Sequence, residues 1–235
     1  MNDNFSSMSS EIGNANNYAS WIVEVFRPHM GGRILEVGVG YGNYKALLPA
    51  SKKHMFVDID ASAIDNAKSK YPDENFLHGN IAEPETVAKL QSEQFDTVIC
   101  FNVLEHIEDD SQAIGNMLSI LQPGGKLLLF VPAFPALYSE MDRFAGHFRR
   151  YTSSSLRQAV AVWSGDIVEM SYFNPIGGLG WWLNKFVSHK SLDDASVNRQ
   201  IILFDKYVLP FSRILNRVTK SLFGQSLVCV IQKLK

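Results

Sequence analysis

The sequence has few of the features that mark secreted and membrane-spanning proteins. Its only two cysteines, Cys100 and Cys229, lie in apolar, strand-like segments, so we expect buried free thiols and no disulfide. No apolar run approaches the roughly 18 residues of a membrane span. The serine-rich residues 1–10 lack the charged and apolar regions of a secretory signal. We therefore expect a cytoplasmic protein. No cysteines or histidines cluster at metal-ligand spacing, so we predict no metal site, and the alternative is one divalent ion recruited by Asp142 with His147.

Charge is nearly balanced over the whole chain but unevenly distributed. The net charge is −2, yet residues 199–235 carry seven basic side chains and one acid, Asp205, a balance of +6. The rest of the chain therefore sums to −8. Because the basic charge is confined to the tail and no recognition module is visible, we expect no nucleic-acid partner.

The most informative stretch runs from Gly32 to Asn43. A short apolar run, residues 34–37, contains one acid, Glu36, and is followed by three glycines at alternate positions. This pattern predicts a buried strand, a tight turn and a helix. Glycines permit positive φ angles and the close approach of a ligand. A carboxylate beside them would repel a pyrophosphate and suits a ligand with a positive end, such as an amino-acid ammonium.

Further apolar runs follow at a spacing typical of βα units. We expect strands over residues 53–58, 75–81, 94–102 and 123–132, and two more over 166–174 and 226–232. Such repetition predicts one α/β domain with a doubly wound, mostly parallel sheet. Asp58 ends the second strand, where an acid can accept hydrogen bonds from both ribose hydroxyls, whereas Asp60 is expected to cap the next helix.

Taken together, the acid and Gly-x-Gly-x-Gly of residues 36–42, Asp58 and the Pro-Gly-Gly turn at 123–125 resemble class I S-adenosylmethionine-dependent methyltransferases. The resemblance covers about residues 30–135 and the final strand. It implies a Rossmann-like sheet of seven strands in the order 3-2-1-4-5-7-6, the last antiparallel, with S-adenosylmethionine as the cofactor.

The resemblance also implies positions for the cofactor. Asn80 and Ile81 occupy the places that bind adenine, and Asn102 ends the fourth strand near the transferred methyl group. Tyr18, on a helix expected over 10–28, either contacts the sulfonium or packs in the core. His106, in a string similar to the continuation of motif IV, is either catalytic or structural. The expected cofactor residues are Glu36, Gly38, Gly40, Gly42, Asp58, Asn80, Ile81, Asn102 and Tyr18.

An active-site loop is expected over residues 132–152, beyond the fifth strand. Its prolines predict irregular structure, and its second half resembles bacterial methyltransferases found with polysaccharide and glycolipid biosynthesis. His147 is the candidate general base, with Asp142 to orient it. Arg149 and Arg150, together with Tyr151, either bind a phosphate or carboxylate of the acceptor or fasten the loop.

A second insertion is expected over residues 175–224, before the last strand. It joins a flexible glycine stretch to Trp181 and Trp182, and later places four apolar residues, Ile214, Leu215, Val218 and Leu222, on one helical face with basic residues elsewhere. Three interpretations remain open: a lid in which Trp181 contacts the acceptor, a homodimer surface, and peripheral contact of 177–224 with an anionic membrane.

These observations predict methyl transfer to a hydroxyl of a small-molecule, glycan-linked or lipid-linked acceptor, with His147 as the base. Alternatives are an N-methyltransferase of the same fold and a non-catalytic domain that binds S-adenosylmethionine. A nicotinamide-dependent oxidoreductase would share the glycine turn and Asp58 but would leave Glu36 and the Pro-Gly-Gly strand unexplained.

Overall fold

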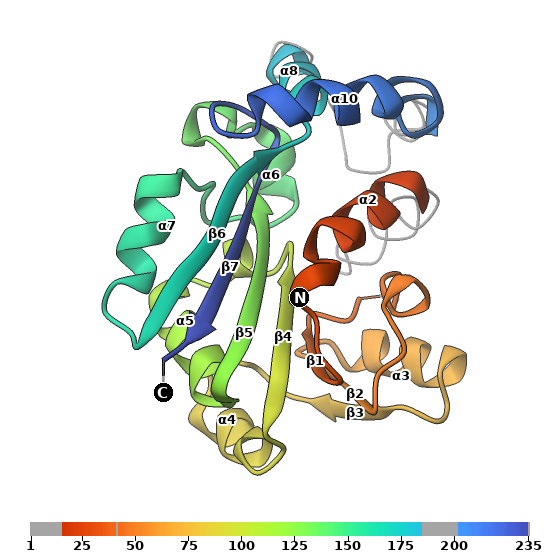
Figure 1. The fold of residues 1–235 in the computed structure, drawn as a ribbon. Coiled ribbons are helices and arrows are strands. Elements are labelled where there is room, and N and C mark those ends of the chain that lie inside the picture. Colours follow the sequence, from red (N-terminus) through yellow and green to blue (C-terminus); the bar gives the residue numbers. More distant parts are fainter. Residues whose placement is uncertain (1–15, 41, 185–201, 235) are drawn as a thin grey trace.

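The structure, a computed structural model, describes residues 16–40, 42–184 and 202–234. Within them a seven-stranded sheet has the order β3-β2-β1-β4-β5-β7-β6 (Figure 1). The final strand, β7, pairs antiparallel with both β5 and β6, while the other pairs are parallel. The predicted strand order and the antiparallel last strand are thus confirmed. The strands are β1 Arg33–Val37, β2 Lys53–Asp58, β3 Asn75–His78, β4 Phe95–Phe101, β5 Leu121–Pro132, β6 Gly165–Phe173 and β7 Ser226–Lys233.

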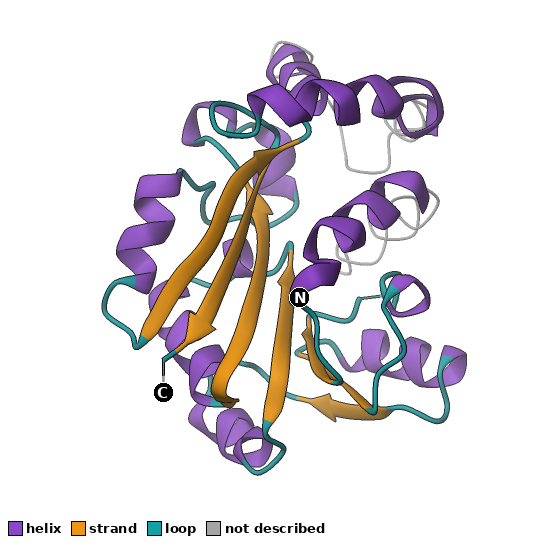
Figure 2. Ribbon diagram, in the orientation of Figure 1, coloured by secondary structure: helices purple, strands orange, loops and turns teal. Residues whose placement is uncertain are grey.

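Helices cover both faces of the sheet, which explains why its strands are almost continuously apolar (Figure 2). In β5, Leu127 and Leu129 pack toward one face and Leu128 and Phe130 toward the other. The first face is covered by α4 Pro84–Gln91, α5 Asp110–Ser119 and α7 Ser153–Val160. The opposite face is covered by α2 Asn16–Phe26 and α3 Ala61–Lys70. Residues 10–15 of the helix expected over 10–28 lie outside the described residues.

The two cysteines are buried free thiols on β4 and β7, as predicted. Asp60 also takes its predicted place as the N-cap of α3, where its side chain accepts a hydrogen bond from the Ser62 N–H at 2.8 Å. Among the described residues, every helix is too short or too polar to cross a membrane.

Three segments differ from the sequence-based prediction. The glycine turn leads into a single 3-10 turn, Lys45–Leu47, and not into the expected helix, because Pro49 leaves too little chain for one. The loop expected to be irregular contains α6 Glu140–Phe144, and the stretch expected to be flexible forms α8 Pro175–Asn184. The glycines of α8 let it pack closely, since a Cβ at Gly178 would lie 2.9 Å from the Phe223 ring.

Both insertions meet at the carboxyl edge of the sheet. Ser226, the first residue of β7, pairs with Pro132 at the end of β5 and with Phe173 at the end of β6. The loop after β5 and the segment that carries α8 and α10 Leu209–Thr219 therefore lie at this edge (Figure 1). Open α/β sheets bind ligands there.

Candidate active site

The glycine turn after β1 is built for close approach of a ligand. Gly38, Gly40 and Gly42 all have positive φ angles, 78°, 47° and 66°. A Cβ at Gly38 would lie 2.1 Å from Val103 Cγ2, so this glycine is needed for packing. A Cβ at Gly40 would meet no described atom within 4 Å, so this position borders open space. The turn thus leaves space beside the main chain at Gly40.

Glu36 is the acid beside this turn, and it is buried on the α2 face of the sheet. Its Oε2 lies 3.4 Å from His54 Nε2, an ion pair only when His54 is protonated. Within the described part of the chain, neither carboxylate oxygen makes a hydrogen bond. Burial raises the pKa of Glu36, and His54 opposes that rise. A buried carboxylate without hydrogen bonds is costly unless a ligand supplies the donor, and the ammonium of S-adenosylmethionine has the required charge.

Other expected cofactor residues lie along the same edge. Asp58 accepts hydrogen bonds from the N–H groups of Gly40, at 3.1 Å, and Asp60, at 2.9 Å, which tie the turn to the end of β2. Burial raises the pKa of Asp58. The Oδ1 of Asn80 accepts from Ala82 N–H at 2.9 Å, and Ile81 is buried in the core on the α4 side. Asn102 is exposed after β4, with a φ of 53°.

Tyr18, a residue of α2, packs at this edge of the sheet. Its ring packs edge-on against Phe130 and Phe173, with centroids 6.5 Å and 5.7 Å away. Burial raises the pKa of Tyr18 to about 12, and hydrogen bonds with Ser226 and Asn174 oppose the rise. Tyr18 therefore has the core contacts foreseen as one alternative, and its hydroxyl lies at the ends of the strands.

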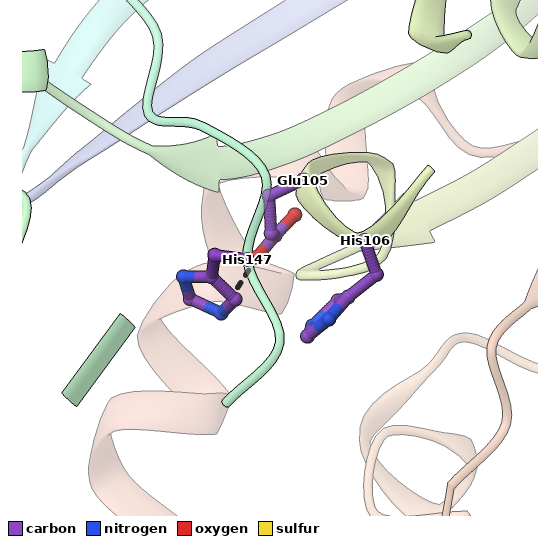
Figure 3. A group of neighbouring side chains, drawn as sticks. All are labelled: Glu105, His106 and His147. Atoms are coloured by element: carbon purple, nitrogen blue, oxygen red, sulfur yellow. Dashed lines mark ion pairs between the residues drawn. The ribbon is translucent and has the colours of Figure 1, made fainter. Parts of the chain in front are cut away.

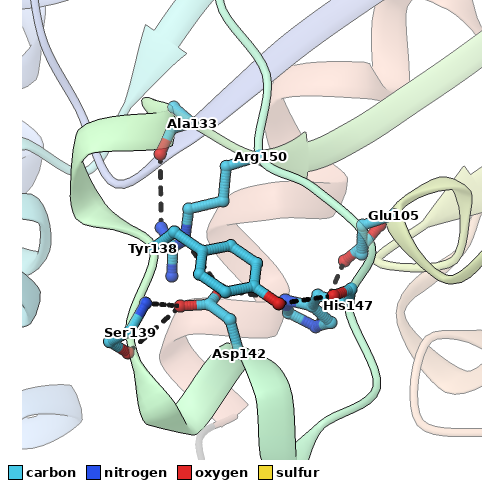
Figure 4. Close-up of polar contacts among 7 residues, drawn as sticks. All are labelled: Glu105, Ala133, Tyr138, Ser139, Asp142, His147 and Arg150. Carbon is cyan, nitrogen blue, oxygen red and sulfur yellow. Dashed lines mark hydrogen bonds and ion pairs between the residues drawn. The ribbon is translucent and has the colours of Figure 1, made fainter.

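The loop after β5 is closed at its base by backbone hydrogen bonds. Tyr151 N–H donates to Pro132 at 2.8 Å, and Phe134 N–H donates to Tyr151 at 2.8 Å. Inside the loop, Tyr138 Oη donates to the His147 carbonyl at 2.7 Å (Figure 4). The chain between these points is therefore an ordered unit, and its own contacts fix the position of His147.

Asp142 is at the centre of this unit (Figure 4). Its Oδ1 accepts from His147 Nδ1 at 2.9 Å and from Arg150 Nε at 2.7 Å, and its Oδ2 accepts from Ser139 N–H at 2.9 Å. Burial would raise the pKa of Asp142, but the hydrogen bond with His147 and the charge and hydrogen bond of Arg150 hold it at about 2. The carboxylate stays ionised at neutral pH, and it fixes the orientation of the His147 ring.

His147 faces two side chains from the turn after β4 (Figure 3). Its Nε2 lies 3.9 Å from Glu105 Oε1, and its ring contacts that of His106 edge-on with centroids 4.7 Å apart. Burial raises the pKa of Glu105 to about 7, with His147 opposing the rise. Burial lowers the pKa of His106 to about 4, and the neighbouring His147 adds to this effect.

Glu105, His106 and His147 also present ligand atoms that all lie within 4.8 Å of one another. Such a group could hold a divalent cation. The sequence did not reveal it because the loop must fold back over the turn after β4 to bring His147 to Glu105. The available signal was a lone acid, Glu105, inside an apolar string.

The remaining expected acceptor residues hold the loop in place. Arg149 forms an ion pair with Asp110 at 2.9 Å and donates to the Glu108 carbonyl at 2.6 Å. Tyr151 is buried and donates to Asp110 Oδ2 at 2.9 Å. The Trp181 ring of α8 lies 4.9 Å from the Arg150 guanidinium, which it covers. The fastening role foreseen for the arginines is thus present in these contacts.

The sequence is similar to those of known methyltransferases over its first half. Residues 35–129 match the family described as "Methyltransferase domain". A probable S-adenosylmethionine-dependent methyltransferase of Mycolicibacterium smegmatis is 33% identical over 101 residues, covering 42% of this chain and 37% of that protein. A ubiquinone biosynthesis O-methyltransferase of Coxiella burnetii is 31% identical over 101 residues, covering 41% of this chain and 42% of that protein. The aligned region thus spans about two fifths of the length of these curated relatives.

Solved structures share the fold over nearly the whole chain. A methyltransferase from Archaeoglobus fulgidus has a TM-score of 0.61 at 17% identity, covering 93% of this chain and 94% of that one. The N-methyltransferase NodS from Bradyrhizobium japonicum, in complex with S-adenosyl-L-homocysteine, has a TM-score of 0.58 at 14% identity and full coverage of both chains. Residues 35–129 thus match the methyltransferase domain family, the chain shares its fold with solved methyltransferases, and these findings support S-adenosylmethionine as the cofactor.

Proposed function

We propose that this protein transfers a methyl group from S-adenosylmethionine to a hydroxyl of a small-molecule, glycan-linked or lipid-linked acceptor, with His147 as the general base. The observation that carries the proposal is the bond between His147 Nδ1 and Asp142, 2.9 Å long. A histidine that donates its Nδ1 proton to a carboxylate presents Nε2 as the proton-accepting atom. That atom points toward Glu105, at the edge where the glycine turn lies.

The chemistry assigned to each part is simple. The cofactor supplies a methyl group already activated on a sulfonium, so the protein's task is alignment and exclusion of water. Glu36 and the main chain at Gly40 would hold the amino-acid end of the cofactor. His147 Nε2 would accept the hydroxyl proton as the acceptor oxygen bonds to the methyl carbon, and the electron pair of the broken carbon–sulfur bond would stay on sulfur. The buried Asp142 carboxylate stabilises the resulting imidazolium.

An oxygen acceptor atom is favoured over a nitrogen one, because a general base assists methylation of an alcohol more than that of an amine. One sequence relative is named an O-methyltransferase, although the match covers 41% of this chain. NodS is named an N-methyltransferase, and at 14% identity its likeness is one of fold. A non-catalytic domain would need Glu36 and the glycine turn but would have no use for the Asp142–His147 pair.

Two variants separate cofactor binding from base catalysis. We expect His147→Ala to lower turnover about 10²- to 10⁴-fold and to leave S-adenosylmethionine affinity within about twofold, because no expected cofactor contact involves this side chain. We expect Glu36→Gln to weaken cofactor binding about tenfold or more, since a charged hydrogen bond is worth about 1.5–3 kcal/mol. Calorimetry gives the affinities, and S-adenosylhomocysteine release in a screen of hydroxyl acceptors gives turnover.

Equal turnover in His147→Ala and the parent would refute the base. A loss of turnover on chelation, restored by added zinc or iron, would favour a role for Glu105, His106 and His147 in holding a cation. Release of no S-adenosylhomocysteine with any acceptor, despite tight cofactor binding, would favour the non-catalytic alternative.

A further inference from the structure

Helix α10 presents an apolar stripe to solvent. Phe211, Ile214, Leu215 and Val218 recur at helical spacing and are all exposed, with Val218 74% exposed. The helix is held to the protein by a different side, where Leu209 and Ser212 are buried. Amphipathic helices of globular proteins normally turn the apolar side inward. In α10 the apolar stripe points outward, and a large exposed apolar patch marks an interaction site.

Helix α8 adds exposed apolar residues at the same end of the molecule (Figure 1). Ser212 Oγ of α10 donates to Asn174 Oδ1 at 2.7 Å and accepts from Ile176 N–H at 3.2 Å, so the two helices are joined at the start of α8. Leu179, Trp182 and Leu183 of α8 are exposed. We call these three residues, with the four on α10, the apical surface; Figure 1 shows both helices at the same end of the molecule.

Basic side chains flank the apical surface. Lys206, Arg217 and Lys220 are exposed beside the stripe. Arg213 forms an ion pair with Glu24 of α2. Within residues 202–234 the sole acid is Asp205, which is buried and accepts hydrogen bonds from the N–H of Tyr18 at 2.8 Å and of Asn17 at 3.3 Å. The exposed charge that residues 202–234 themselves place around the apolar stripe is thus positive.

We propose that the apical surface docks the protein on an anionic lipid bilayer. An apolar stripe with tryptophan and flanking lysine and arginine is the composition of a helix that lies in a membrane interface. A protein partner or a second copy would have to match the positive rim with acids, whereas anionic lipid headgroups supply that charge everywhere.

The surface is also connected to the candidate active site. Adjacent tryptophans of α8 face opposite ways: Trp182 is exposed on the apical surface, while the Trp181 ring covers Arg150, which binds Asp142. A bilayer on this surface would therefore lie next to the base. Resting on the proposed function, this geometry favours an acceptor that resides in the membrane.

Vesicle flotation of the full chain tests the docking without any methyl transfer. We expect flotation with phosphatidylcholine vesicles that contain phosphatidylglycerol at low salt, and little with phosphatidylcholine alone or at high salt. Because each basic residue near such a surface contributes about fivefold, Arg217→Gln with Lys220→Gln should weaken partitioning roughly 30-fold. Val218→Ser should weaken it several-fold through lost apolar burial.

Matched controls lie elsewhere on the surface. Val162 is 72% exposed, so Val162→Ser is the counterpart of Val218→Ser. Lys68 and Lys70 on α3 are exposed, so Lys68→Gln with Lys70→Gln matches the double charge change. We expect both controls to float like the parent.

Three outcomes would overturn the proposal: no flotation at low salt, equal loss in the controls, or a dimer by sedimentation velocity that Val218→Ser dissociates while the parent does not float. Because flotation does not depend on turnover, a failed methyltransferase assay would leave this result intact, and the reverse also holds.

Discussion

Replacing Glu105 with glutamine should stabilise the protein at neutral pH. Glu105 is 1% exposed, and its Oε2 makes no hydrogen bond within the described part of the chain. Burial raises its pKa from the ordinary value of 4.5 to about 7. The folded state therefore holds this proton more tightly than the unfolded state does, and the free energy of unfolding falls as the pH rises between these values.

The size of the effect follows from the two pKa values. From 4.5 to about 7, at about 1.4 kcal/mol per pH unit, the loss amounts to about 3 kcal/mol. Glutamine keeps the shape of the protonated acid but cannot ionise. The variant should therefore match the parent near pH 4.5 and exceed its free energy of unfolding by about 3 kcal/mol above pH 7.

His106 also titrates, so the effect of Glu105 must be read from the difference in free energy of unfolding between Glu105→Gln and the parent. Burial lowers the pKa of His106 from 6.5 to about 4, so the unfolded state binds that proton more tightly and the free energy of unfolding rises with pH between about 4 and 6.5. The two groups oppose each other in the parent, and the difference between Glu105→Gln and the parent isolates the carboxylate. Urea unfolding of both proteins from pH 4.5 to 8 measures it, with the exposed Glu85→Gln as the control. Parallel stability curves for Glu105→Gln and the parent would refute the reasoning.

Two further predictions concern the glycine turn and the buried ion pair. Gly40→Ala should lower the free energy of unfolding by about 1–2 kcal/mol because of its positive φ, and it should weaken S-adenosylmethionine binding at least tenfold in calorimetry. Gly38→Ala should chiefly destabilise the fold, because its Cβ would clash with Val103. Unchanged cofactor affinity in Gly40→Ala would remove the turn from the cofactor site. Asp142→Ala should lower the free energy of unfolding by about 3–5 kcal/mol by leaving the buried Arg150 without its partner, and Arg150→Met added to it should restore part of that loss. An additive double variant in thermal or urea unfolding would contradict this coupling.

The sequence predicts the sheet well because buried parallel strands are apolar runs between glycine or proline breaks. β2 was predicted over residues 53–58 and spans Lys53–Asp58. Helix α4 was missed: Pro84 at its first position and the pair Val87 and Leu90 were the signals, but eight residues give little periodicity. Helix α8 was hidden by its glycines, which normally indicate a turn and here permit tight packing.

The sequence predicted contacts of the candidate site only between residues that are close together in the chain. Asp142 and His147 are five residues apart, and the turn that follows α6, where Gly146 has a φ of 79°, brings them within hydrogen-bonding distance. The capping box of Ser139 and Asp142 was a readable sign of that helix. The approach of Glu105 to His147 depends on a fold-back of the chain between positions far apart in sequence, which no local pattern encodes.

The closed base of the loop after β5 has a consequence for how such proteins diversify. Since Phe134 and Tyr151 are joined by a backbone hydrogen bond, the chain leaves and rejoins the scaffold at a single point. The stretch between them carries His147, Asp142 and Arg150, so it is a unit that can be exchanged as a whole. Exchanging this unit between homologues would replace the proposed base and the residues that hold it in one step, while the proposed cofactor residues Glu36 and Asp58, on β1 and β2, would stay unchanged.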